Sequence, residues 1–210
     1  STFPSDATRL QVRITPDDFP LDDVLHIVKP RPKTLLFFQE LTGKYEPIGE
    51  KFRRFRNVEA TSDLSQADLS LVTYDPLQPS LPSGNGVIMV TEAARDGNYL
   101  RGQIVAEKHP LMDGVNWQPL QARDSIQIQL NENDTILLWQ GDRPMIALRT
   151  SVTPPTGERD EPQRIQQLIF NFDLTLSNAE QLECTALLLH RFTEDLRKLK
   201  IASELSLIHI

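Results

Sequence analysis

The sequence has a single cysteine, Cys184, and no uninterrupted apolar run long enough to cross a membrane as a helix, which takes about 18 residues or more. One cysteine cannot form an internal disulfide, and it cannot supply a structural zinc site built on several thiolates. No signal peptide is recognisable. We therefore expect no direct insertion of this segment into a membrane. Its two ends, polar at Ser1 and apolar from Leu205 to Ile210, indicate boundaries with neighbouring segments of a longer protein.

Basic residues are also in short supply. The 210 residues contain 22 Lys and Arg against 29 Asp and Glu, which gives a formal net charge of -7. The densest basic run, from Lys51 to Arg56, has acidic neighbours of its own. A chain this acidic repels phosphate backbones, so nucleic acid is excluded as an expected partner. Apolar residues make up 39% of the chain, which is enough to build a core.

The first 30 residues differ in pattern from the rest. Arg9 to Thr15 alternates apolar and polar residues, which predicts a half-buried strand. Pro30 and Pro32 then stiffen a linker. We interpret residues 1–30 as the end of a preceding β-sandwich or a linker segment, 31–200 as the main domain, and 201–210 as a tail. An unpaired strand at 9–15 would fray, join the edge of the main sheet, or pair with another molecule, so self-association through the termini is possible.

The first half of the main domain predicts buried parallel strands. Thr34 to Glu40 and Gly86 to Glu92 are nearly continuous apolar runs, typical of strands covered on both faces. Shorter strands are predicted at Asn57–Ser62 and Asp68–Asp75. Pro47 can open a helix whose apolar face is formed by Ile48, Phe52 and Phe55.

The second half predicts an antiparallel meander and a long helix. Asp124 to Leu130 alternates strictly, as an antiparallel strand with one wet face does. Three more strands are predicted at Thr135–Gln140, Pro144–Val152 and Arg164–Asp173. Ser177 and Glu180 have capping-box spacing, so a helix should begin there and run to about Lys200. The expected fold is α/β: a flavodoxin-like three-layer sheet, mostly parallel, with an antiparallel meander in the second half and a long C-terminal helix.

No motif for catalysis, cofactor or metal binding stands out. Cys184 lies beside the apolar stripe of the C-terminal helix and is interpreted as a core residue. The histidines lack HExxH spacing, and no G-x-S-x-G elbow is present. Gly84 and Gly86 precede a strand, which is the wrong order for a phosphate-binding loop. We expect no cofactor and no catalytic residues.

Three loop residues are weak candidates for contact with a ligand or partner: His109, Asp113 and Asp173. His109 and Asp113 lie in a loop rich in Pro and Gly, and Asp173 ends a strand where α/β sheets often bind ligands. A structural interpretation competes with the functional one. It has His109 bonding to nearby backbone, and Asp173 and Ser177 capping the helix. If the functional interpretation holds, the chain is a small-ligand-binding or hydrolytic domain that uses these three residues.

Five segments resemble one protein family in their order along the chain. They are LDDVLHIVKPRPKTLLFFQE, SLPSGNGVIMV, HPLMDGVNW, GDRPMIALR, and FNFDLTLSN followed by the helix that ends LLLHRFTEDLR. The chain resembles, over roughly residues 20–198, the class I glutamine-amidotransferase-like domain of Bat-type (aerotolerance-regulator-type) bacterial membrane proteins. The resemblance implies a parent protein with transmembrane helices and a von Willebrand factor A domain. It also implies that Leu21 to Asp23 closes a preceding β-sandwich.

This resemblance does not imply glutaminase activity. A true glutamine amidotransferase has a cysteine at the turn after a central strand, whereas Gly86 to Glu92 continues here into AARDGN without one. We therefore expect a non-catalytic scaffold or interaction module of a membrane-anchored protein, not an enzyme. Its partners would be proteins or other domains of the same chain. The expected location is the extracytoplasmic (periplasmic) side of a bacterial inner membrane, with a cytoplasmic location left open.

Overall fold

The computed structural model describes residues 9–13, 24–28, 33–41, 45–77, 79, 81–91, 96–154 and 162–206. The chain divides into two compact units, residues 1–33 and residues 34–210. The division falls just after the stretch that contains Pro30 and Pro32.

The first unit holds a two-stranded antiparallel sheet. Strand β1 (Arg9–Arg13) pairs with β2 (Val24–Val28), and Arg9 lies opposite Val28. The predicted strand is therefore present in its described part. Strand β1 is therefore neither unpaired nor added to the edge of the main sheet, because its partner lies within its own unit. The third expectation, pairing with another molecule, stays a prediction. An antiparallel neighbour close in sequence satisfies the ladder hydrogen bonds that an isolated strand would leave open.

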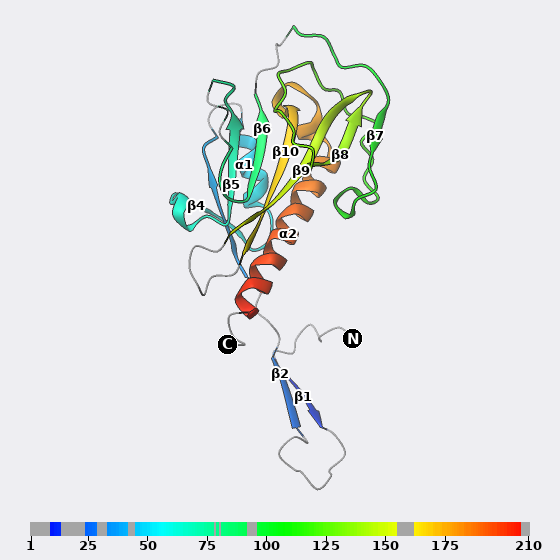
Figure 1. Ribbon diagram of the computed structural model, residues 1–210. Coiled ribbons are helices and arrows are strands. Elements are labelled where there is room, and N and C mark those ends of the chain that lie inside the picture. The colour runs from blue at the N-terminus through cyan, green and yellow to red at the C-terminus, as the bar shows by residue number, and fades with distance from the viewer. Residues whose placement is uncertain are drawn as a thin grey trace. The chain divides into compact units, whose positions relative to one another are not determined.

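The second unit is built on one eight-stranded sheet with the order β4-β3-β5-β6-β10-β9-β8-β7 (Figure 1). From β4 to β10 every neighbouring pair is parallel, and from β10 to β7 every pair is antiparallel. The predicted α/β class, with a mostly parallel sheet and a later antiparallel meander, is confirmed. The strands are β3 (Leu35–Gln39), β4 (Val58–Thr61), β5 (Leu69–Tyr74), β6 (Gly86–Val90), β7 (Ile104–Ala106), β8 (Thr135–Gln140), β9 (Arg143–Thr153) and β10 (Gln163–Asp173).

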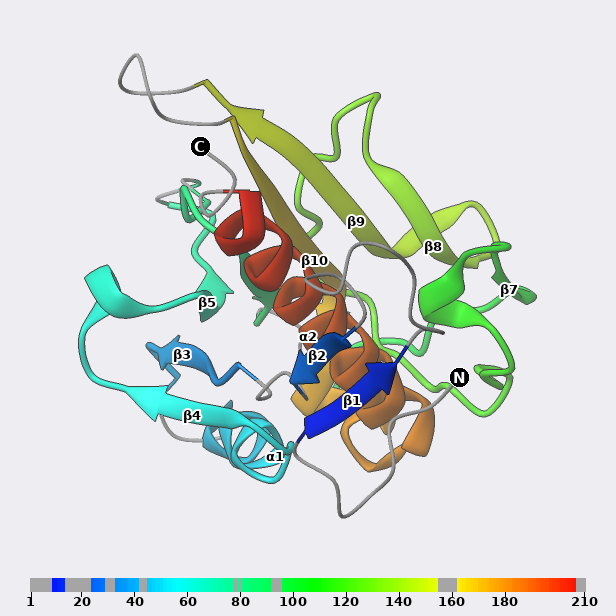
Figure 2. The same cartoon turned by 90° about the horizontal axis from the view of Figure 1, so that it is seen from below.

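Two α-helices cover the same face of this sheet (Figure 2). Helix α1 (Glu46–Arg53) contributes Ile48 and Phe52 to the main core, and α2 (Glu183–Ser206) contributes Leu189 and Phe192. Four short 3-10 turns complete the described helical segments: η2 (Leu64–Gln66), η3 (Pro110–Met112), η4 (Leu174–Leu176) and η5 (Ala179–Gln181).

The long C-terminal helix is confirmed, but its predicted limits were wrong at both ends. The Ser177 hydroxyl donates to the Leu174 carbonyl and accepts from the Ala179 amide, so it stabilises a separate turn and not the start of α2. The helix begins six residues later, at Glu183, and continues through Ser206. Residues 201–206 of the predicted tail are therefore helical.

The opposite face of the sheet differs most from expectation. Asp124 to Leu130 is not a sheet strand; it crosses that face as an extended segment. Its alternation has the predicted physical meaning, because Ile126, Ile128 and Leu130 pack on Ile88 and Ile169. Its amides bond elsewhere, however: the Ile128 N–H donates to the Asn171 side chain at 2.7 Å. Extended chain thus takes a place that a third layer of helices would fill, and in the described residues the expected three-layer arrangement is not found.

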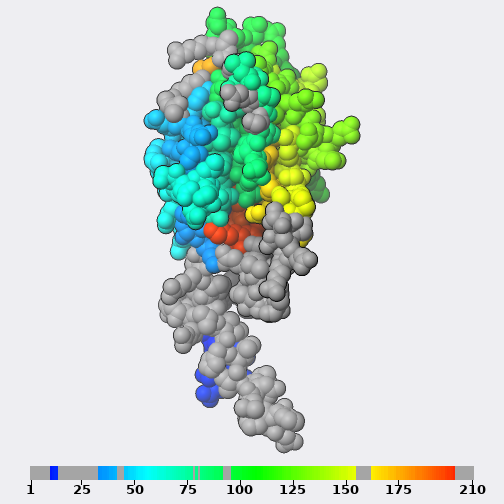
Figure 3. All heavy atoms as spheres, turned by 60° about the vertical axis from the view of Figure 1, so that its left-hand side comes forward, coloured from blue at the N-terminus to red at the C-terminus, as the bar shows by residue number. Residues whose placement is uncertain are grey.

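A space-filling view of this side shows atoms of the β5 to β6 region at the surface (Figure 3). They lie between the colours of α1 and β4 on one side and those of β9 and β10 on the other. Within the described residues, neither helix is both long enough and apolar enough to span a bilayer.

Candidate functional site

The carboxyl edge of the parallel strands is the first place to examine, since open α/β sheets bind ligands there. Tyr45 stands at the N-terminal end of α1, Thr91 follows β6, and Asp173 ends β10. The Tyr45 hydroxyl lies 3.0 Å from the Thr91 carbonyl oxygen and 3.2 Å from Oδ2 of Asp173. One phenolic proton therefore serves two acceptors, and it joins the ends of β6 and β10 to the start of α1.

The second carboxylate oxygen of Asp173 is also engaged. Oδ1 accepts from the Thr175 amide at 2.9 Å, from the Thr175 hydroxyl at 2.7 Å and from the Leu176 amide at 3.2 Å. Asp173 is only 2% exposed. The predicted capping role is thus correct in kind, but the carboxylate caps the turn η4 and not the long helix. Both carboxylate oxygens therefore accept hydrogen bonds that stabilise the fold.

His109 and Asp113 flank the turn η3, which lies against α2. Nδ1 of His109 accepts from the Leu111 amide at 3.2 Å, as the structural interpretation predicted. Arg191 of α2 donates to the Asp113 carbonyl at 2.6 Å and to the Leu111 carbonyl at 3.0 Å. Burial lowers the pKa of His109, and the nearby Asp195 carboxylate opposes that effect.

The structure therefore brings His109 and Asp113 together and gives Asp173 a different set of contacts. In the part of the chain that the structure describes, no three His, Cys, Asp or Glu side chains gather as a metal site. The contacts of His109 and Asp173 favour the structural interpretation of these two residues, whereas Asp113 is exposed and contacts Arg191 through its backbone carbonyl.

Cys184 lies in the first turn of α2 and belongs to the main core. Burial raises the pKa of its thiol, against smaller opposing contributions from hydrogen bonds with Thr185. A thiol is nucleophilic as the thiolate, so this environment works against reactivity.

A polar cleft of about 430 Å³ opens beside the turns η4 and η5. Three backbone segments are tied together around it. Leu100 donates to the Ala122 carbonyl at 2.8 Å, and Asp124 donates to the Asn98 carbonyl at 3.0 Å. The Gln121 amide donates to the Asn178 side chain at 2.7 Å. The lining residues are Tyr99, Gln121, Arg123, Thr175, Leu176, Ser177, Asn178 and Gln181.

Arg123 is the one charged side chain among those lining residues. Its guanidinium carbon lies 4.3 Å from the centre of the Tyr99 ring, a stacking distance for a cation on an aromatic face. One terminal nitrogen donates to the Gly97 carbonyl at 2.7 Å and the other to the Tyr99 hydroxyl at 3.1 Å. The side chain is therefore held in one orientation at the wall of the cleft.

A second hollow, of about 390 Å³, lies on the face covered by the extended segment. It is lined by Tyr74, Pro79, Leu81, Ile128, Gln129, Asn131 and Arg149. Its arginine is already paired, because Arg149 donates to both carboxylate oxygens of Asp134, at 2.8 and 2.6 Å. This hollow has no uncompensated charge among its described lining residues.

Sequence reasoning missed Tyr45, Tyr99 and Arg123. Each is a single residue in or beside a loop, and its role depends on partners far away in the chain. Tyr45 and Asp173 are 128 positions apart, and no local pattern in the sequence links them. The one available signal was the position of Tyr45 shortly after a buried strand, at a helix start.

Comparison with known proteins adds no relative: no family model, no curated protein and no solved structure matches this chain.

Proposed function

We propose that this chain is a non-catalytic interaction domain of a membrane-anchored bacterial protein, similar to the glutamine-amidotransferase-like domain of Bat-type proteins. The observation that carries the proposal is the hydrogen bonding at the carboxyl ends of the parallel strands. The Tyr45 hydroxyl bonds to both Thr91 and Asp173, and the Asp173 carboxylate also caps the turn η4. Groups that an enzyme of this architecture would direct at a substrate are here committed to holding strands and helix together.

The strand order supports the flavodoxin-like part of this proposal. Numbered by their order along the chain, the five parallel strands β3, β4, β5, β6 and β10 stand in the sheet as 2-1-3-4-5. That is the order of doubly wound flavodoxin-like sheets. The antiparallel strands β7 to β9 come from an insertion between the fourth and fifth parallel strands.

The chain's one cysteine supports the non-catalytic part. Cys184 is on α2, inside the core, and not at a turn after a parallel strand. Its pKa is raised by burial, whereas a nucleophilic cysteine needs a lowered pKa or an adjacent base.

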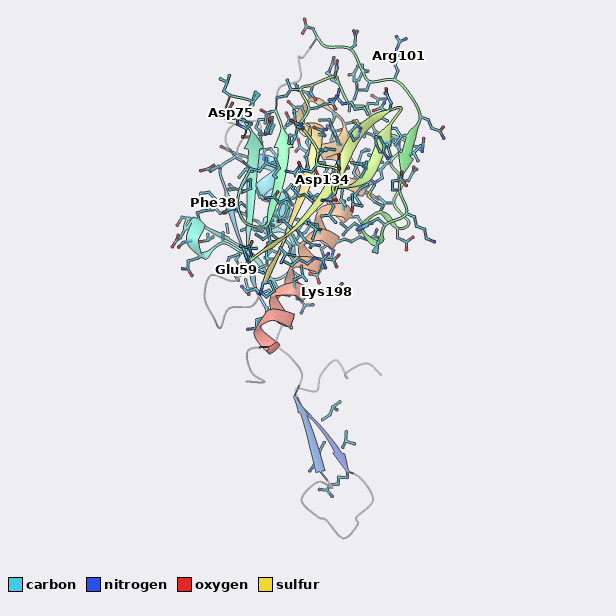
Figure 4. All side chains as sticks on the ribbon, in the orientation of Figure 1. Phe38, Glu59, Asp75, Arg101, Asp134 and Lys198 are labelled. Carbon is cyan, nitrogen blue, oxygen red and sulfur yellow. The ribbon has the colours of Figure 1, made fainter. Side chains whose placement is uncertain are left out.

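The sheet face opposite the two α-helices supports an interaction role. Phe38 of β3 and Val72 and Tyr74 of β5 are half-buried there with no α-helix over them in the described residues. Figure 4 shows Phe38 at the outer side of β3. Such a face suits a protein partner or another domain of the same chain, and the net charge of -7 disfavours nucleic acid.

Covalent labelling tests the catalytic half of the proposal. The protein is incubated with a diazoketone analogue of glutamine, which alkylates the nucleophilic cysteine of a glutaminase, and the intact mass is measured. We expect no adduct on native Cys184. Iodoacetamide on urea-unfolded protein is the control, and it should modify Cys184 fully. An adduct at native Cys184 that excess glutamine prevents would contradict the proposal.

A reporter fusion tests the location. Alkaline phosphatase, which is active only outside the cytoplasm, is fused after Ile210 in the natural full-length protein. High phosphatase activity is the expected result, whereas an inactive but stably produced fusion would place the domain in the cytoplasm.

The other function considered, a ligand-binding or hydrolytic domain that uses His109, Asp113 and Asp173, is not favoured by the contacts of those residues. The cleft around Arg123 is the feature that favours ligand binding.

A further inference from the structure

We propose that the cleft beside η4 and η5 binds a small carboxylate through Arg123. This inference goes beyond the interaction role proposed above and does not depend on it. The ligand would be a monoanion whose remaining atoms carry hydroxyl or amide groups. It could be a free small molecule or the C-terminal carboxylate of a protein segment.

The charge of Arg123 is the first observation. The other seven lining residues are uncharged, and no ion pair joins Arg123 to an acidic residue within the described part of the chain. Two other arginines, by contrast, each have a carboxylate partner. Arg143 pairs with Asp124, and Arg149 pairs with Asp134. In a chain with seven more negative than positive charges, a partly buried arginine without a carboxylate is an unfilled site for one.

Pre-organisation is the second observation. A guanidinium has five N–H donors, and Arg123 uses two nitrogens to bond the Gly97 carbonyl and the Tyr99 hydroxyl. Together with the contact to the Tyr99 ring, these two bonds hold the group in one orientation, so the remaining donors keep one direction. Since less rotational freedom is lost when the ligand binds, a fixed guanidinium is a better receptor than a mobile one.

The surrounding side chains define the ligand class. Gln121 and Gln181 are exposed amides that can donate and accept. The hydroxyl of Thr175 lies on the same wall and can only accept from a ligand, because its proton is donated to Asp173. A single positive charge suits a carboxylate, which carries one negative charge. A phosphate monoester carries nearly two and is normally held by several cations or by a helix N-terminus. We therefore expect carboxylates to bind better than inorganic phosphate.

The walls of the cleft are also fixed. Gln121 and Asn178 are joined by bonds in both directions, and the Asn178 side chain donates to the Pro119 carbonyl at 2.8 Å. Tyr99 and Arg123 form an isolated antiparallel bridge. The loops that carry the site are thus held together by backbone hydrogen bonds, as a preformed ligand site requires.

Matched acid and amide probes test this site on the full 210-residue chain. Binding of lactate is compared with lactamide, and binding of N-acetyl-Ala-Gln-Ala as the free acid is compared with its C-terminal amide. The readouts are calorimetry and the NMR shift of the Arg123 Nε–H signal. Because charge-assisted hydrogen bonds contribute about 1.5–3 kcal/mol, each acid should bind roughly 10- to 100-fold more tightly than its amide.

The two acids distinguish the sources of the carboxylate. Tight binding of lactate would identify a free small molecule, and binding of the peptide acid alone would identify a chain terminus; either result supports the site. Equal binding of acid and amide, absence of saturation by both acids, or tighter binding of inorganic phosphate would each overturn the proposal. This comparison uses the natural chain, so it remains decisive if a variant fails to fold.

Substitutions then assign the effect to Arg123. Arg123→Gln should weaken binding of the acid about 10-fold or more. Arg123→Lys should give a smaller loss, because lysine keeps the positive charge but lacks the planar pair of N–H donors that matches a carboxylate. Arg101→Gln is the matched control. Arg101 is exposed on the loop before β7 (Figure 4), and its substitution should leave the affinity unchanged. Equal affinities for the natural chain and a folded Arg123→Gln variant would exclude Arg123 as the receptor.

Discussion

The hydroxyl of Tyr45 lies 3.2 Å from Oδ2 of Asp173, across 128 residues of sequence. Tyr45 stands at the start of α1 and Asp173 at the end of β10, so this contact joins the first helix to the last strand of the sheet. The same hydroxyl also reaches the Thr91 carbonyl after β6. Polar groups at the edge where ligands usually bind are thereby turned inward and serve the fold.

Removing the Tyr45 hydroxyl should destabilise the domain. In Tyr45→Phe the ring remains packed, but the bonds to Asp173 and Thr91 are lost at a buried position. We expect the free energy of unfolding to fall by about 1–3 kcal/mol in urea denaturation. Tyr74→Phe is the control, because Tyr74 is half-buried and its hydroxyl has no bond to the described residues. Equal losses in the two variants would show that the Tyr45 bonds contribute nothing.

The anchoring of α2 is tested at Phe192. Its ring is 1% exposed and lies in the main core, so Phe192→Ala should lower the free energy of unfolding by about 3–5 kcal/mol. Leu187, on the same helix, is 39% exposed, and Leu187→Ala should cost clearly less. A loss below about 1 kcal/mol for Phe192→Ala, measured by the same denaturation, would mean that the buried face of α2 is misassigned.

Stability should decrease as the pH falls through the range in which His109 gains a proton. Burial is the main cause that lowers its pKa below the ordinary value of 6.5. The unfolded chain therefore binds the proton first. The stability that neutral His109 contributes is complete above pH 6.5 and is lost as the pH falls through the lower value of the folded protein. Protonation of Nδ1 would also break its bond from the Leu111 amide.

The measurement is the unfolding midpoint between pH 7.5 and 5.5 for the natural chain and for His109→Asn. Asparagine can accept the same amide bond but does not titrate. The natural chain should lose more stability than the variant over this range. Parallel curves would show that His109 has no part in the pH dependence.

Much of the sheet follows from local pattern. The apolar runs that contain Leu35–Gln39 and Gly86–Val90 predict buried strands, because such runs fit only between two covered faces. Strand β7 was missed, since the three residues Ile104–Ala106 are too few to show a period. Asp124 to Leu130 was assigned to the sheet because alternation reveals a buried face but not the partner of the backbone amides. The Asn171 side chain decides that point for Ile128, and it lies 43 residues away.

The candidate site was less predictable than the fold. His109, Asp113 and Asp173 are ionisable groups near turns, and turns need such groups for capping as often as binding sites do. Arg123 carried no motif. Its significance comes from an absent acidic partner and from stacking on Tyr99, and both are properties of the folded chain.

Self-association through the termini remains a prediction. Leu207 to Ile210 lies outside the described residues, and Val12 of β1 is 43% exposed. An exposed apolar residue on a two-stranded sheet favours contact with another chain. Sedimentation of the full chain should show association that weakens in a chain trimmed to residues 31–206. Monomeric behaviour of both would contradict the prediction.

Ammonia release from glutamine tests the central claim most directly. The full chain, at a concentration high enough to detect slow turnover, is incubated with glutamine beside a Cys184→Ala variant. Because Cys184 is buried with a raised pKa and the carboxyl edge is occupied by Tyr45 and Asp173, we expect both proteins to match the rate without protein. Turnover well above that rate, abolished by Cys184→Ala in a variant of unchanged stability, would contradict the assignment of this chain as a non-catalytic interaction domain.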